Sequence, residues 1–143
     1  MGVNEKMRAL PRLDSVNRDF WTGGELGELR ILHCADCDQF IHPPRPVCRH
    51  CLSENLKSKA VSGNGVIDTF TINHQQWHPK MDVPFVIARV ALDDAPGVYL
   101  TTNIVGCDVS EVDIGDQVQV TFLQQDDVFL PIFEKVTFEK VAK

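Results

Sequence analysis

The sequence predicts a mainly β protein made of a short N-terminal helix, a zinc ribbon and a C-terminal five-stranded barrel of the OB type. Two observations predict it. Two C-x2-C pairs are separated by ten residues within positions 34–51. Five short runs rich in β-branched and aromatic residues follow, with one segment suited to a single helical turn before the fourth. An open sandwich of the same five strands is the alternative architecture.

The N-terminal part, residues 1–29, is expected to be an arm followed by a helix. Residues 1–13 show no regular pattern and are expected to be a loose arm. Asp14 or Ser15 can cap a short helix that runs to about Trp21. Three glycines between positions 23 and 27 then end the helix.

The zinc ribbon is expected over residues 30–61. Alternation of apolar and polar residues in 26–33 predicts a strand that enters the first cysteine pair. Phe40-Ile41 leads out of that pair, and three prolines between positions 43 and 46 make a stiff bridge to the second. Residues 56–61 form the strand that leaves the ribbon.

The barrel is expected over residues 62–143, after a seam at Ser62-Gly63-Asn64-Gly65. Residues 108–113 suit one helical turn. Pro131 indicates an edge or a bulge in the last strand. The five strands are predicted at Val66–Ile72, Phe85–Leu92, Val98–Val105, Gln117–Leu123 and Phe129–Phe138.

Four cysteines, Cys34, Cys37, Cys48 and Cys51, are the predicted metal ligands. Two tight turns with this spacing place four thiolates around one Zn²⁺, and a site with four protein ligands is structural. Iron bound by the same thiolates and a pair of disulfides are the alternatives. No secretory signal is visible, which favours a reducing, cytoplasmic location and therefore metal. Nearby histidines could compete as ligands, but four sulfurs form the simpler set.

Charge is distributed unevenly along the chain, whose net charge is −6. The net charge is −1 over residues 1–29, +2 over residues 30–59 and −7 over residues 60–143. An acidic barrel repels a polyanion, so nucleic acid is disfavoured as a partner even though OB barrels often bind it. No run of 18 apolar residues predicts a membrane span.

An ordered series of motifs resembles a known family over about residues 14–136. The motifs are Phe20-Trp21, the two cysteine pairs, Pro43-Pro44-Arg45, Ser62-Gly63-Asn64-Gly65-Val66, Pro84-Phe85-Val86, Asn103-Ile104-Val105-Gly106, Ile114-Gly115-Asp116-Gln117-Val118 and Leu130-Pro131-Ile132-Phe133. In this order they resemble the zinc-ribbon plus OB-fold family called domain of unknown function 35. The cysteine spacing alone is shared by many ribbons, whereas the whole series is far more specific.

The resemblance implies a rubredoxin-like ribbon joined to an OB barrel. It also implies an accessory subunit of thiolase-like enzymes, or of acyl-CoA hydratases and aldolases, that helps to hold coenzyme A while its partner supplies the catalytic groups. One departure concerns the residue after each cysteine pair, which is often glycine because φ is positive there. Asp38 and Leu52 stand at these positions, and leucine predicts a distorted second turn.

Several side chains are candidates for contact with a ligand or partner. Arg45, between prolines, and Arg49 could meet the anionic groups of a coenzyme A thioester, or be ordinary solvated arginines. Trp77 and His78 lie in a long loop after the first barrel strand, where Trp77 either covers the barrel mouth or meets a partner. Phe20 and Trp21 either pack on the barrel or anchor in the partner.

The sequence thus predicts a cytoplasmic, non-catalytic accessory subunit that docks on a thiolase-like or hydratase-like acyl-CoA enzyme and helps form its acyl-CoA entrance. No residue is predicted to be catalytic. One alternative is a nucleic-acid-binding zinc-ribbon and OB module. The other is a standalone acyl-transfer enzyme that uses Cys107, the one cysteine outside the ribbon, although Gly106-Cys107-Asp108 also suits a plain turn.

Overall fold

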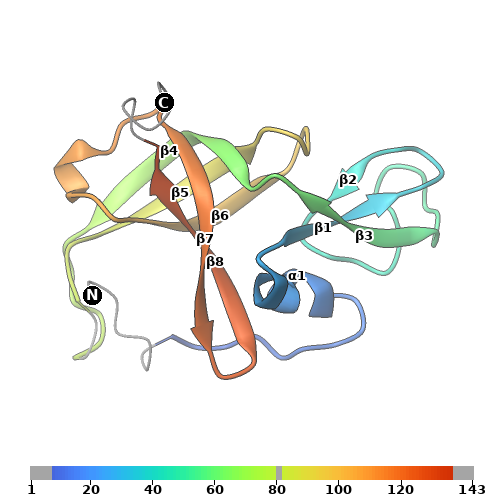
Figure 1. Ribbon diagram of the computed structural model, residues 1–143, viewed down its shortest axis with the longest axis horizontal. Coiled ribbons are helices and arrows are strands. Elements are labelled where there is room, and N and C mark those ends of the chain that lie inside the picture. The colour runs from blue at the N-terminus through green and yellow to red at the C-terminus, as the bar shows by residue number, and fades with distance from the viewer. Residues whose placement is uncertain (1–7, 80–81, 137–143) are drawn as a thin grey trace.

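The computed structural model describes residues 8–79 and 82–136. A three-stranded ribbon lies beside a closed five-stranded barrel, and a short helix lies near their junction (Figure 1). The elements in chain order are α1 (Arg18–Thr22), the 3-10 helix η2 (Gly23–Leu26), β1 (Leu29–Cys34), β2 (Phe40–Ile41), β3 (Leu56–Val61), β4 (Asn64–Asn73), β5 (Phe85–Leu92), β6 (Tyr99–Val105), the 3-10 helix η3 (Val109–Glu111), β7 (Gln117–Gln125) and β8 (Val128–Lys135).

Helix α1 begins later than its sequence predicts. The carboxylate of Asp14 accepts hydrogen bonds from the N–H groups of Val16 and Asn17, each at 2.8 Å. These bonds form a separate turn, so the regular helix starts at Arg18. In the described part of the chain no helix is long and apolar enough to cross a membrane.

The ribbon is an antiparallel sheet in the order β2-β1-β3. β1 pairs with β3 along its whole length, from Leu29 opposite Val61 to Cys34 opposite Leu56. Only two residue pairs join β1 to β2. The central strand β1 therefore ends with Cys34 at one end of the sheet, where the first cysteine turn begins.

The five C-terminal strands close into a barrel in the order β4-β5-β6-β8-β7, and β7 returns to β4. Neighbouring strands are antiparallel except β6 and β8, which are parallel. The helical turn η3 precedes the fourth barrel strand, as predicted, and begins with a capping box between Asp108 and Glu111. The closed barrel confirms the predicted OB architecture and excludes the open sandwich.

One hydrophobic core serves the helix, the ribbon and the barrel. Leu29 and Ile31 of β1 are each 1% exposed and belong to the same buried cluster as barrel residues such as Phe133. Phe20 of α1 joins this cluster. A second, small hydrophobic cluster lies within the ribbon, and its buried members are Cys34, Ile41 and Cys48. The ribbon tip therefore has little apolar core of its own.

Candidate metal centre and contact surfaces

The two cysteine turns have the same backbone geometry. In the first turn the N–H of Asp38 donates to the carbonyl of Cys34 at 2.8 Å. In the second turn the N–H of Leu52 donates to the carbonyl of Cys48 at 2.9 Å. The N–H of each leading cysteine also donates to the carbonyl five residues further on. These bonds hold both cysteine pairs in equivalent loops.

Leu52 does not distort the second turn, which corrects the expectation from sequence. Its φ is +66°, close to the +62° of Asp38 in the first turn. Its side chain is 77% exposed, so the left-handed backbone does not force it into the ribbon core. The cost is therefore local backbone strain and not altered ligand geometry.

Leu52→Gly is expected to stabilise the zinc-loaded protein by about 0.5–1 kcal/mol, because glycine adopts a positive φ without a steric cost and an exposed side chain contributes little packing. The measurement is the midpoint of urea unfolding. Ile114→Gly is the matched control, since Ile114 is 66% exposed and is not among the described residues with positive φ. It should be neutral or destabilising, and an equal gain in both variants would contradict the explanation.

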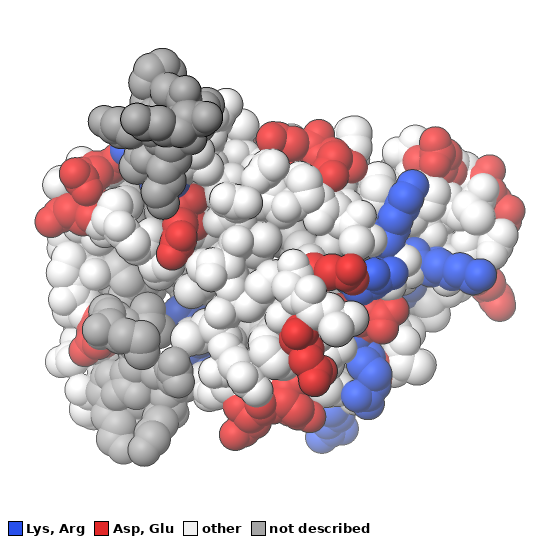
Figure 2. Space-filling model, in the orientation of Figure 1, with Lys and Arg blue, Asp and Glu red and all other residues white. Residues whose placement is uncertain are grey.

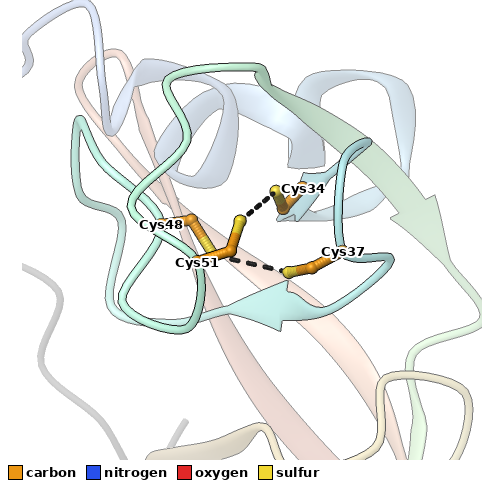
Figure 3. Close-up of side chains that lie close together, drawn as sticks. All are labelled: Cys34, Cys37, Cys48 and Cys51. Carbon is orange, nitrogen blue, oxygen red and sulfur yellow. Dashed lines mark hydrogen bonds between the residues drawn. The ribbon is translucent and has the colours of Figure 1, made fainter.

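The four cysteine sulfurs converge on one point (Figure 3). The Sγ atoms of Cys34 and Cys51 lie 3.6 Å apart, as do those of Cys37 and Cys48, and all four lie within 4.8 Å of one another. Sulfurs bound at about 2.3 Å to one Zn²⁺ lie about 3.8 Å apart, whereas a disulfide needs about 2.0 Å. The arrangement fits a four-thiolate metal site and not two disulfides.

The nearby histidines are not part of this cluster. His33 Nε2 lies 2.7 Å from the carboxylate of Asp38, and the ring of His42 packs 4.7 Å from that of Phe20. The backbone N–H of His50 donates to the sulfur of Cys48 at 3.3 Å. Burial acts to raise the pKa of Cys48, but hydrogen bonds to its sulfur from the backbone N–H groups of Cys51 and His50 and from the thiols of Cys37 and Cys51 together lower the pKa to about 7. These N–H groups favour the thiolate that binds metal.

Arg45 and Arg49 are both exposed on the ribbon. Arg45 lines a groove of about 450 Å³ that also contains Lys57, Asp19 and Glu54. On the face drawn in Figure 2, basic side chains gather toward the ribbon, whereas carboxylates are also spread over the barrel. A contact between these arginines and an anionic ligand stays a prediction.

Phe20 and Trp21 differ in exposure although they are neighbours in sequence. Phe20 is 7% exposed and belongs to the core, so it leaves little surface for a partner. Trp21 is half-buried, and its ring meets that of Phe20 edge-on at 4.8 Å. Of the two, Trp21 is the one that keeps surface for contact.

Trp77 does not cover the barrel mouth. It is 74% exposed, and its Nε1 donates to Asn73 Oδ1 at 3.0 Å. His78 is exposed in the same loop. This loop joins β4 to β5 at the end of the molecule opposite the ribbon (Figure 1). The candidate contacts therefore form two separate surfaces, one with Arg45 and Arg49 and one with Trp77 and His78.

Cys107 has a poor environment for a nucleophile. Burial raises the pKa of its thiol, and although Lys135 opposes this effect, Glu111, Asp116 and Asp108 add to it. At neutral pH the thiol form is therefore favoured over the reactive thiolate. The side chain packs against the barrel core, which supports the reading of this segment as a plain turn.

The N-terminal arm holds residues that the sequence analysis did not single out. Arg8 Nη2 donates to Asn103 Oδ1 at 2.8 Å, and Gln125 Nε2 donates to the carbonyl of Arg8 at 3.0 Å. From residue 8 onward the arm is therefore fastened to the barrel, contrary to the expected loose conformation. It borders a pocket of about 570 Å³, whose walls also come from α1, the prolines after His42 and the barrel. No local motif in the sequence indicates this contact.

The fold and the cysteine cluster together define a zinc ribbon joined to an OB-fold barrel. Family models for the two parts of ChsH2 match this chain: the rubredoxin-like zinc ribbon domain over residues 21–57 and the C-terminal OB-fold domain over residues 58–123. The chain belongs to this family of ChsH2 and DUF35 proteins, which confirms the resemblance found in the sequence.

Curated relatives include longer hydratase subunits and short scaffold proteins. The "Probable enoyl-CoA hydratase alpha subunit" of Thermomonospora curvata is 34% identical over 92% of this chain and 42% of its own length. The "3-oxo-4,17-pregnadiene-20-carboxyl-CoA hydratase alpha subunit" of Mycobacterium tuberculosis is 35% identical over 84% of this chain and 39% of its own. The chain thus spans about two fifths of these subunits. A "DUF35 domain-containing scaffold protein" of Methanothermobacter thermautotrophicus is 31% identical over 62% of this chain and 67% of its own.

Solved structures agree with this assignment. A chain of the "Ltp2-ChsH2(DUF35) aldolase" superposes with a TM-score of 0.80 at 29% identity, covering 90% of this chain and all of that one. A DUF35 protein of unknown function from Sulfolobus solfataricus superposes with a TM-score of 0.58 at 17% identity, covering 82% of this chain and 83% of that one. The second likeness shows the fold alone.

Proposed function

We propose that this protein is a non-catalytic accessory subunit that docks on a thiolase-like or hydratase-like acyl-CoA enzyme and helps to form its acyl-CoA entrance. The likeness to a chain of the Ltp2-ChsH2(DUF35) aldolase, over that chain's full length, carries the proposal. The hydratase alpha subunits among the relatives support it. The environment of Cys107, which favours the thiol, speaks against independent acyl transfer by this chain.

In this proposal one exposed surface contacts the partner enzyme and the other contacts acyl-CoA. Trp77 is a large, rigid and exposed side chain, a type that contributes strongly at protein interfaces. Arg45 presents its charge beside a groove of the ribbon, where an anionic cofactor needs only a few cations. Because the two surfaces lie at opposite ends, the partner contact and the acyl-CoA contact can be tested by separate substitutions.

Nucleic-acid binding is disfavoured by the ion pairs of the barrel. Arg89 Nε lies 3.1 Å from Asp68 Oδ2, and Lys135 Nζ lies 3.4 Å from Asp116 Oδ2. The cations of the described barrel strands thus already face carboxylates, which reduces their attraction for phosphate. Salt-sensitive retention of the zinc-loaded protein on single-stranded DNA would contradict this interpretation.

Trp77→Ala is expected to weaken binding to the partner about tenfold or more without lowering the thermal midpoint, because Trp77 is exposed and absent from the core. The measurement is analytical ultracentrifugation of the zinc-loaded chain mixed with each thiolase-like and hydratase-like protein encoded near it in its native genome. Ile114→Ala removes another exposed apolar side chain and serves as the control.

Arg45→Ala tests the acyl-CoA role in the assembled complex. We expect a higher KM for acyl-CoA at unchanged subunit affinity, whereas Arg12→Ala, which removes an exposed arginine from the arm, should change neither. If none of the candidate enzymes associates with this chain, the accessory role is wrong. If association occurs but Arg45→Ala leaves KM unchanged, the role of Arg45 at the entrance is wrong.

A further inference from the structure

The pocket between the N-terminal arm and the barrel has the features of a ligand site. Its volume of about 570 Å³ lies within the range of small-molecule pockets. Phe20 and Trp21 of α1 and apolar residues of β5, β6 and β8 form much of its wall, and Pro43 and Pro44 form another part. Four parts of the chain thus line one largely apolar pocket.

The charge of this pocket is opposite to that of the protein. The chain has 20 acidic and 14 basic residues, yet the residues that line the pocket include no aspartate or glutamate. Its polar groups include Arg8 and His42. Burial lowers the pKa of His42 to about 4, so its ring is neutral at pH 7 and Arg8 supplies the charge.

Arg8 is held in place but has unused hydrogen-bonding capacity. Asn103 accepts one hydrogen bond from its guanidinium, and the Asn103 amide is itself oriented by a bond from Nδ2 to the carbonyl of Val86 at 2.8 Å. No carboxylate of the described residues forms an ion pair with Arg8, and its Nε is buried without a partner there. A guanidinium has five N–H donors, and a carboxylate can accept two of them at once.

His42 contributes a second unsatisfied group to the same pocket. Its Nδ1 is buried without a hydrogen-bond partner among the described residues, while its ring packs on Phe20. Such a group in an apolar wall costs free energy unless another molecule satisfies it or its surroundings relax. Because its Nδ1 is buried, His42 acts as part of the wall, and Arg8 offers the charged contact to the head of a ligand whose body is apolar.

We propose that this pocket binds a small molecule with an apolar chain and a carboxylate head, with the carboxylate on Arg8 and the chain between α1 and the barrel. This site does not depend on the proposed docking role, because it lies within one chain. Its test uses the isolated zinc-loaded protein, so its failure is distinct from failure of the partner hypothesis.

The experiment follows the fluorescence of Trp21, which lines the pocket, in a Trp77→Phe background that leaves one tryptophan. Octanoate is the probe, and octanol has the same chain length without the charge. We expect saturable binding of octanoate that is about tenfold or more tighter than that of octanol, as a charge-assisted contact implies. Equal affinities, or no saturable binding of octanoate, would overturn the proposal.

Substitution of Arg8 provides the second arm of the test. Arg8→Gln should remove the preference for octanoate over octanol, whereas Arg12→Gln, an exposed arginine of the same arm, should leave it intact. Arg8→Lys keeps the charge without the planar fork and should retain part of the preference, which covers the case in which Arg8→Gln loosens the arm. An unchanged preference in a folded Arg8→Gln variant would refute the assigned role.

Discussion

Cys48→Ser is expected to abolish stoichiometric zinc binding and to lower the thermal midpoint by roughly 10 °C or more. Cys48 is fully buried and belongs to the small ribbon cluster with Cys34 and Ile41. In zinc-finger peptides the metal contributes roughly 10–16 kcal/mol of apparent binding free energy that is also folding free energy. Elemental analysis should give one zinc per wild-type chain, and calorimetry should give the change in midpoint.

Cys107→Ser is the control for this result, because Cys107 is a half-buried cysteine that lies outside the cluster of four sulfurs. It should keep one zinc per chain. A strong chelator added to the wild-type protein should reproduce the loss seen in Cys48→Ser. Wild-type protein that contains no metal and is as stable as Cys48→Ser would refute the structural role of the cluster.

Gly63→Ala is expected to destabilise the protein by about 2–5 kcal/mol. Gly63 lies between β3 and β4 with a φ of +81°, a conformation that costs an L-residue about 1–2 kcal/mol. A Cβ at this position would also collide with the side chain of Val120 on β7, and overpacking of this kind typically costs about 1–3 kcal/mol. Urea unfolding of the zinc-loaded protein measures the loss.

Gly97→Ala separates the two causes. Gly97 has a similar φ of +84°, but a Cβ there would meet nothing within 4 Å. Its substitution should therefore show the backbone cost alone, about 1–2 kcal/mol. Equal losses in the two variants would mean that the contact with Val120 contributes nothing at the seam.

The strands were predictable where local pattern and burial agree. The predicted bounds of β3 and β5 match the structure. β5 is apolar except for Arg89, whereas β3 is bounded by Leu56 and Val61 and pairs with β1 along its whole length. β4 begins two residues before the predicted Val66, because Asn64 and Gly65 pair with β7, far away in sequence. The last predicted strand continued to Phe138, which lies outside the described residues, whereas β8 ends at Lys135.

The parts of the candidate site that are formed by residues close together in sequence were predictable. The spacing of the cysteines identified the four sulfurs, because each pair closes its own turn. The anchorage of Arg8 could not be predicted, since its partner Asn103 lies 95 residues away and neither belongs to a basic cluster or a metal motif. The exposure of Trp77 also depends on the three-dimensional course of its loop, which amino-acid type does not determine.

The strand β1 limits which ribbons from related proteins could be grafted onto this barrel. Its Leu29 and Ile31 fill the core shared with the barrel, while its end carries a metal-site cysteine. A ribbon grafted from a relative would need to bring side chains that fit this barrel, or it would leave cavities beneath itself. Chimaeras cut between ribbon and barrel should therefore fold poorly, because the helix, ribbon and barrel share one hydrophobic core.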